Sequence, residues 1–222
     1  MLRPSKRWRF HWPIAHHVRV HSPFFQTEAA GSGLVIRLIS PDKTNRLTRA
    51  CVQALTAALE QLKLENQVHP LIIAGNGQFF SVGADLNQIA TLSGPDAYEF
   101  SAMGQKLMCA VASYPASVVA AVEGHCMGGG LDLALACHRR IAAPHAVFAH
   151  RGAVLGLVTG WGGTQRLPRL VGKSRALEIF TAADKISAAR ALEIGLVDAI
   201  TDDPIAAAER WNQSAGPFST LA

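Results

Sequence analysis

The sequence contains few cysteines, few charged residues and no long apolar run. Four cysteines in 222 residues are too few for a disulfide framework, and their apolar surroundings predict reduced core thiols of a cytoplasmic protein. With 49% hydrophobic and 17% charged residues, the chain is not of the disordered class. Its apolar stretches end well short of the ~18 residues of a membrane helix, so no membrane association is expected.

Acidic residues are absent from residues 1–22, which hold five of the 21 lysines and arginines. The other 200 residues carry 16 basic and 16 acidic side chains, so the net charge of +5 belongs to this segment. It could be a phosphate-binding arm or a targeting peptide. We favour a poorly ordered basic extension and expect no nucleic-acid partner. Its four histidines lack cysteine or carboxylate partners, so no metal site is expected.

Strand and helix signals alternate along the rest of the chain. Apolar runs predict strands, and apolar residues at helical spacing predict helices, of which the first begins after the N-cap Thr48. The strands are expected at 34–39, 71–75, 117–122, 140–143 and 196–200, and the helices at 48–65, 93–113, 128–137, 174–181, 187–194 and from 204. This alternation predicts one α/β core over residues 23–203. Residues 204–222 are expected to begin a C-terminal helical region.

Two glycine-rich turns follow predicted strands, at Phe79–Leu86 and Gly124–Asp132. Glycines at a helix start leave backbone N–H groups unpaired at the positive end of the helix dipole, where they suit an anion or a developing oxyanion. Two such turns could each supply one N–H group to a single carbonyl oxygen. Other motifs are incomplete: Gly172-Lys173-Ser174 ends like a P-loop, but Leu167 replaces its first glycine.

Four segments of the chain follow one another in a specific order. They are Phe80–Leu86, Gly128–Gly130, Gly162–Gly172 and Thr181–Val197. Together they resemble the crotonase (enoyl-CoA hydratase/isomerase) superfamily over roughly residues 33–215. The resemblance implies a spiral of ββα turns, here with a shortened C-terminal helical region, and a homotrimer or hexamer. It also implies an acyl-CoA substrate, with coenzyme A as part of the thioester and no permanently bound cofactor.

The resemblance also implies roles for individual residues. The oxyanion hole would use the backbone N–H groups of Ala84 and Gly129. Residues beside coenzyme A would come from the segment after the first strand and from the two glycine turns: Lys43, Asn45, Arg46, Leu47, Ser81, Gly83, Asp85, Leu86 and Gly128. For Lys43 and Arg46, which could meet phosphates, an ordinary solvated turn is the alternative.

Both catalytic carboxylates of the family hydratases are altered in this chain. Asp132 stands where the first glutamate falls, and Gly152 stands where the second falls. His150 could be a substitute base because imidazole titrates near neutrality, or it could be a packing or surface residue. Asp132 could instead serve only as a helix-terminal carboxylate. A nucleophilic pair of His125 and Cys126 is improbable, because adjacent residues of an extended segment point opposite ways.

Two function classes therefore remain. The first is an enzyme that stabilises a thioester enolate, with Asp132 as the retained acid/base, in a hydration, an isomerisation or another enolate reaction such as decarboxylation. Ordinary hydratase activity is in doubt, because one carboxylate is lost. The alternative is a non-catalytic acyl-CoA-binding or interaction subunit on the same fold. Replacement of a family lysine by Asn87 puts coenzyme A affinity in doubt as well.

Overall fold

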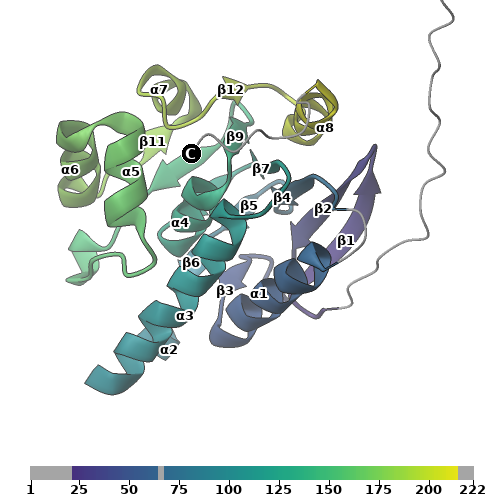
Figure 1. Cartoon of the computed structure of the whole chain (residues 1–222). Helices are drawn as coiled ribbons and strands as arrows, with labels where there is room; N and C mark the ends of the chain where they lie inside the picture. The colour runs from purple at the N-terminus through teal and green to yellow at the C-terminus, as the bar shows by residue number, and fades with distance from the viewer. Residues whose placement is uncertain (1–21, 65–67, 215–222) are drawn as a thin grey trace, which may run out of the picture.

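A six-stranded sheet forms the centre of the computed structural model, which describes residues 22–64 and 68–214 (Figure 1). Its order is β1-β2-β4-β7-β9-β12, and only the β1–β2 pair is antiparallel. The strands are β1 (Phe25–Ala30), β2 (Gly33–Leu38), β4 (Leu71–Ala74), β7 (Val118–Val122), β9 (Arg139–Ala142) and β12 (Ala199–Ile200). Every residue of β4 and β7 is buried, as expected for parallel strands covered on both faces.

A four-stranded sheet of order β11-β10-β8-β5 lies beside the first. Its strands are β5 (Phe79–Ser81), β8 (His125–Met127), β10 (Val147–Ala149) and β11 (Ile186–Ser187). A two-stranded pair joins β3 (Arg46–Leu47) to β6 (Gly83–Ala84). Along the chain, β4, β7 and β9 of the large sheet are followed by β5, β8 and β10 of the small one, and helices come next. This is the predicted spiral of ββα turns.

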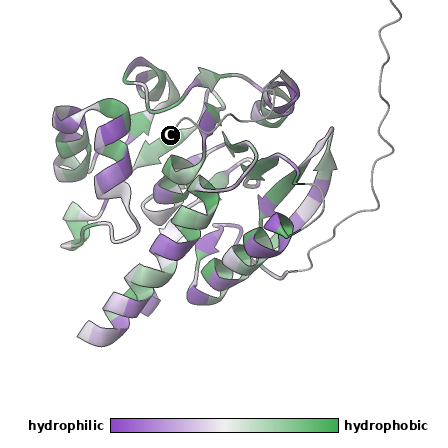
Figure 2. Ribbon diagram, viewed as in Figure 1, coloured by the Kyte–Doolittle hydropathy of each residue, from purple (hydrophilic) through white to green (hydrophobic). Residues whose placement is uncertain are grey.

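Helices cover both faces of the large sheet. They are α1 (Arg49–Lys63), α2 (Leu86–Ile89), α3 (Gly94–Ala112), α4 (Gly129–Ala136), α5 (Gly163–Val171), α6 (Lys173–Ala182), α7 (Ala188–Glu193) and α8 (Pro204–Ser214), with a 3₁₀ turn η1 (Ala153–Leu155). The main apolar core lies between the sheets and α1, α3 and α4, whereas α8 packs through Ala208 on the other face (Figure 2). Thr48 caps α1 as predicted, accepting a hydrogen bond from the Cys51 N–H at 3.2 Å.

Several elements differ from the sequence prediction. The strand expected at 196–200 covers only Ala199–Ile200, because the Leu196 and Val197 N–H groups both bond the Ala191 carbonyl in a turn. Strand β1, the four strands of the small sheet, the β3–β6 pair and helices α2 and α5 were not predicted. Residues 1–21 and 215–222 lie outside the described residues, so the expectations for the basic extension and the chain end are not addressed by the structure.

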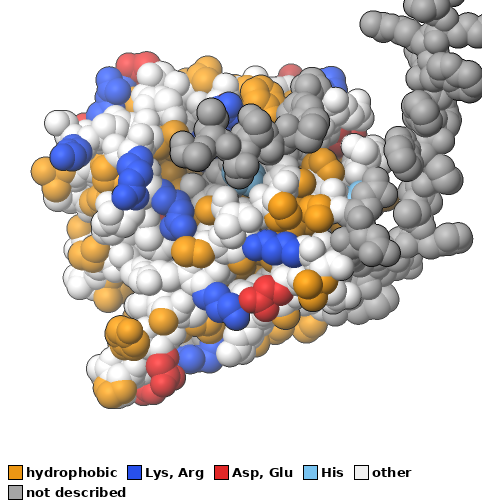
Figure 3. Space-filling view, in the orientation of Figure 1, with side chains coloured by type: hydrophobic (Ala, Val, Ile, Leu, Met, Phe, Trp, Pro, Cys, Tyr) orange, Lys and Arg blue, Asp and Glu red, His pale blue; other side chains and the backbone are white. Residues whose placement is uncertain are grey.

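Charges of both signs are distributed over the surface of the fold. On the face in Figure 3, lysine and arginine side chains over α5 and α6 are interspersed with hydrophobic and neutral ones. In the described part of the chain, no helix combines the length and apolar character needed to cross a membrane.

Candidate active site

A cavity of about 600 Å³ opens between the small sheet, α3 and the segment that precedes α5. Strands β5, β8 and β10 are parallel, so their carboxyl ends meet at one edge, where the cavity lies. Most of its wall is apolar. The lining residues comprise Val82, Ala84, Leu86, Ile89, Leu92, Ala97, Phe100, Ser101, Met127, Gly128, Gly129, Asp132, His150–Gly152, Val154, Leu155 and Leu157–Trp161.

The two glycine-rich turns meet in the cavity wall. A Cβ atom added to Gly129 would lie 3.2 Å from the Ala84 nitrogen, so the two backbone segments are in contact. Gly129 is the first residue of α4, and its N–H group therefore has no acceptor within the helix and lies at the positive end of the helix dipole. The preceding Gly128 has φ +50°, a conformation that favours glycine.

Three of the residues expected beside coenzyme A hold the first turn in place. The side-chain amide of Asn45 donates to the Phe79 carbonyl at 2.8 Å. The Ser81 hydroxyl donates to the Asn45 carbonyl at 2.7 Å and accepts from the Gly83 N–H at 3.0 Å. Asn45, Ser81 and Gly83 are buried, so they position the backbone that carries Ala84.

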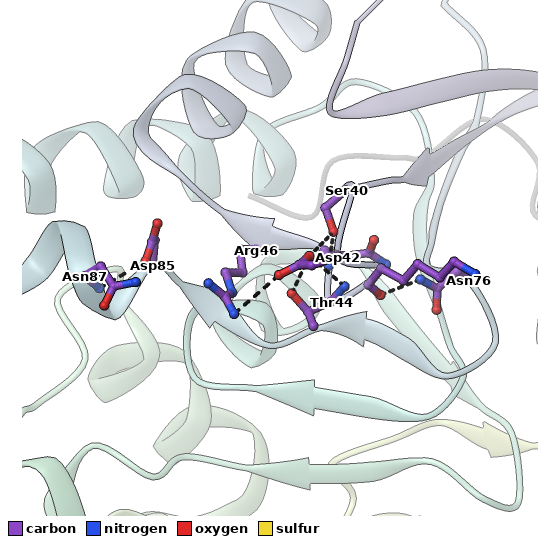
Figure 4. Close-up of polar contacts among 9 residues, drawn as sticks. Ser40, Asp42, Thr44, Arg46, Asn76, Asp85 and Asn87 are labelled. Carbon is purple, nitrogen blue, oxygen red and sulfur yellow. Dashed lines mark hydrogen bonds and ion pairs between the residues drawn. The ribbon is translucent and has the colours of Figure 1, made fainter.

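Lys43, in the loop before β3, and Arg46, the first residue of β3, are both exposed. Figure 4 shows Arg46 beside Asp42. Arg46 pairs with Asp42 at 3.3 Å. Hydrogen bonds to Asp42 from the Ser40 hydroxyl and then from Thr44 lower the pKa of the Asp42 carboxyl from 3.8 to about 2. The carboxylate therefore stays charged and orders a loop that presents two cations.

The remaining residues expected beside coenzyme A are divided between surface and core. Asp85 caps α2 and accepts from the Asn87 N–H at 3.0 Å (Figure 4). Leu86 is 51% exposed and lines the cavity, as does Gly128. The Leu47 side chain has no exposed surface, so it can contribute to a ligand site only through its backbone.

A buried carboxylate and a buried imidazole form a pair in the cavity wall. Asp132 lies on α4 one turn after Gly129 and is 1% exposed, and His150, directly after β10, is 4% exposed. Asp132 Oδ1 and His150 Nε2 are 3.1 Å apart. The His150 ring also packs edge-on against Phe180, with centroids 5.1 Å apart. His150 is thus not a surface residue, and the structure brings together the two groups that the sequence analysis named separately.

Gly152 has no room for a side chain in its present backbone position. A Cβ atom there would lie 2.5 Å from the Leu157 carbonyl oxygen. The backbone of Gly152 has helical φ and ψ angles, and the residue directly precedes η1. The loop backbone at Leu157 therefore occupies the space that a side chain at position 152 would need.

Two residues of the cavity were missed by sequence reasoning. The Thr159 hydroxyl donates a hydrogen bond to Asp132 Oδ2. Trp161 is 3% exposed, and its indole N–H donates to the Phe100 carbonyl at 3.3 Å. A Cβ atom on Gly129 would lie 2.6 Å from the Trp161 ring, so the indole lies against the start of α4. Both residues precede the Gly162–Gly172 motif, and neither belongs to a periodic pattern.

The surroundings of Cys126 disfavour it as the nucleophile of a pair with His125. Burial raises the pKa of the Cys126 thiol well above its ordinary value, with smaller contributions from Cys137 and Asp132. His125 packs against Phe79, with ring centroids 5.3 Å apart. Among the described residues, no three His, Cys, Asp or Glu side chains are grouped to hold a metal ion.

Fold and site together define an α/β protein in which two backbone segments meet beside a carboxylate and an imidazole in an apolar cavity. The sequence model described as enoyl-CoA hydratase/isomerase matches residues 28–214. The chain belongs to this family, the crotonase superfamily. The predicted family and fold are thereby confirmed.

Curated relatives and solved structures agree with this assignment. The "Probable enoyl-CoA hydratase" of Bacillus subtilis is 39% identical over 79% of this chain and 68% of its own. The "Crotonyl-CoA hydratase" of Syntrophomonas wolfei is 39% identical over 75% of this chain and 64% of its own, which is just under two thirds.

Among solved structures, enoyl-CoA hydratase of Bacillus anthracis aligns with a TM-score of 0.80 at 32% identity, over 87% of this chain and 78% of its own. DspI of Pseudomonas aeruginosa aligns at 0.83 and 31%, over 92% and 79%.

Proposed function

We propose that this protein acts on acyl-CoA thioesters in a hydratase- or isomerase-type reaction that passes through an enolate. The observation that carries the proposal is the buried Asp132–His150 pair, 3.1 Å apart, in the cavity that Ala84 and Gly129 also line. An oxyanion site beside a proton-transferring pair is what formation of a thioester enolate requires.

The two backbone N–H groups would hold the thioester oxygen. As the enolate forms, negative charge moves onto that oxygen, and donors already aimed at it need no reorganisation. In acyl-transfer enzymes one such donor contributes about 3–4 kcal/mol. The positive end of α4 adds to this field at Gly129.

Asp132 and His150 would together replace the two carboxylates of the family hydratases. The aspartate is one methylene shorter than glutamate, and its side chain is only 2% exposed. The imidazole lines the same cavity and lies within hydrogen-bond distance of the carboxylate. Acting together, a carboxylate and an imidazole can take a proton from water and return one to the α-carbon, as addition of water to an enoyl thioester requires.

The reaction can be tested with crotonyl-CoA, by the ultraviolet loss of the conjugated thioester. Asp132→Asn and His150→Gln keep the side-chain volumes nearly unchanged, and each is expected to lower kcat by about 10²-fold or more. His125→Gln is the matched control, because His125 is not part of the cavity wall. Turnover by Asp132→Asn and His150→Gln at the wild-type rate would overturn the assignment of this pair.

A non-catalytic acyl-CoA-binding subunit is the second candidate function. The observation in its favour is the backbone at Gly152, which leaves no room for a second carboxylate. Absence of turnover with crotonyl-CoA and with isomerase and decarboxylase substrates, together with calorimetric binding of butyryl-CoA, would establish this function in place of the first.

We also propose that the protein assembles as a homotrimer or hexamer and works in the cytoplasm. Membership of the family supports the assembly, and light scattering of the purified protein measures it directly. Four free cysteines, three of them buried, support a reducing compartment.

A further inference from the structure

Both oxygens of the Asp132 carboxylate are engaged by groups in the cavity wall. Oδ1 lies 3.1 Å from His150 Nε2, and Oδ2 accepts the Thr159 hydroxyl hydrogen. The Thr159 oxygen itself accepts from the backbone N–H of Trp161 at 3.4 Å. Because that N–H approaches the hydroxyl oxygen, the hydroxyl hydrogen is directed to Asp132, and the carboxylate is held with Oδ1 beside His150 Nε2.

The Asp132 carboxylate determines which nitrogen of His150 carries the proton, because Oδ1 lies beside Nε2. A carboxylate can only accept, so His150 Nε2 must donate to Oδ1 and the neutral ring must have its proton on Nε2. Nδ1 is then the basic nitrogen. Within residues 22–64 and 68–214, no hydrogen-bond partner occupies Nδ1, and His150 lines the cavity.

We propose that Thr159 is a positioning residue that holds the Asp132 carboxylate against His150 Nε2 and thereby makes His150 Nδ1 the base of the reaction. Asp132 then orients the imidazole instead of touching the substrate. The inference rests on the proposed function and divides the roles within it. Neighbouring groups hold the arrangement: a Cβ atom on Gly163 would lie 2.2 Å from Asp132 Oδ1, and Phe180 packs on the His150 ring.

The proton balance of a hydration closes with this single base. His150 Nδ1 takes a proton from water while the water oxygen bonds to the β-carbon of the enoyl thioester. The electron pair of the double bond moves through the α-carbon to the thioester oxygen, where the Ala84 and Gly129 N–H groups stabilise it. The imidazolium, stabilised by Asp132, then returns a proton to the α-carbon, and neutral His150 is regenerated. No oxidant or further reactant is consumed.

The test uses histidine labelled with ¹⁵N in the full chain, with the His150 resonances identified by their loss in His150→Gln. In the wild type we expect the neutral form of the His150 ring to carry its proton on Nε2. Thr159→Val keeps the side-chain shape but removes the hydroxyl, so both tautomers should become populated. Thr159→Ser keeps the hydroxyl and should resemble the wild type. Thr159→Ala provides a second hydroxyl-free variant in case the valine variant does not fold.

Kinetics supply an independent readout of the same role. Loss of the Thr159 hydroxyl should lower kcat about tenfold or more, leave KM within twofold, and be reversed in Thr159→Ser. A single Nε2-protonated ring in both hydroxyl-free variants would overturn the proposal, as would equal kcat in Thr159→Ser and Thr159→Val. Should the protein turn over no acyl-CoA, the proposed function fails, and the tautomer measurement still decides whether Thr159 sets the state of the pair.

Discussion

Substitution of Gly163 by alanine adds a single methyl group and should strongly lower the activity of the site. Gly163 is the first residue of α5, and an added Cβ atom would lie 2.2 Å from Asp132 Oδ1 and 3.2 Å from His150 Nε2. Since real Cβ atoms essentially never approach closer than 3.0 Å, the carboxylate must retreat by about 0.8 Å. Misplacement of a catalytic group by about 1 Å can cost roughly 10²-fold in rate. Overpacking should also lower the free energy of unfolding by about 1–3 kcal/mol.

The assay is kcat with crotonyl-CoA, measured beside thermal unfolding. Gly94→Ala is the matched control, because Gly94 begins α3 and its added Cβ would meet no atom within 4 Å. We expect kcat to fall about 10²-fold in Gly163→Ala and to be unchanged in Gly94→Ala. A Gly163→Ala protein with kcat within threefold of wild type would refute the reasoning, since the carboxylate could then move without consequence.

Four further predictions concern the backbone at Gly152, the reactivity of the thiols, the length of the acyl chain and the pKa of Asp42. Gly152→Glu should not raise kcat and should lower the melting temperature, because its Cβ atom would strike a backbone carbonyl. Ellman's reagent should modify exposed Cys109 rapidly and the other three thiols only on unfolding, since burial raises the pKa of Cys51 and of Cys137 to about 12. Along a series of longer enoyl-CoA substrates, KM should fall by up to about fourfold per methylene buried in the apolar cavity. The Asp42 carboxyl should titrate by ¹³C NMR with a pKa of about 2 instead of 3.8, so that its contribution to loop order is present above pH 4 and is lost as the pH falls through 2.

The sequence predicted those helices and strands that are specified by residues within the element itself. Helix α1 follows from its apolar spacing and from the Thr48 cap, and β4 and β7 follow from short apolar runs. Helix α5 begins at Gly163 and contains Pro168, residue types that usually interrupt a helix, and its buried residues Gly163, Leu167 and Val171 at helical spacing were overlooked. The pair β3–β6 has two residues per strand and exists only because two distant turns meet.

The candidate site divides in the same way. The glycine turns were identified as a possible shared oxyanion site, because glycines at a helix start leave backbone N–H groups unpaired. Resemblance to the family identified the position of Asp132. The partnership of Asp132 with His150 and Thr159 joins residues 18 and 27 positions away along the chain. Such contacts depend on tertiary packing, so the spacing of residues along the sequence does not predict them.

The central claim is that the cavity stabilises a thioester enolate and moves a proton at the α-carbon. Exchange of the α-protons of butyryl-CoA in D₂O, followed by ¹H NMR, measures that step whatever the overall reaction is. We predict exchange with the wild-type protein and its loss in His150→Gln. Absence of exchange with the wild type, or equal exchange in both proteins, would contradict the account.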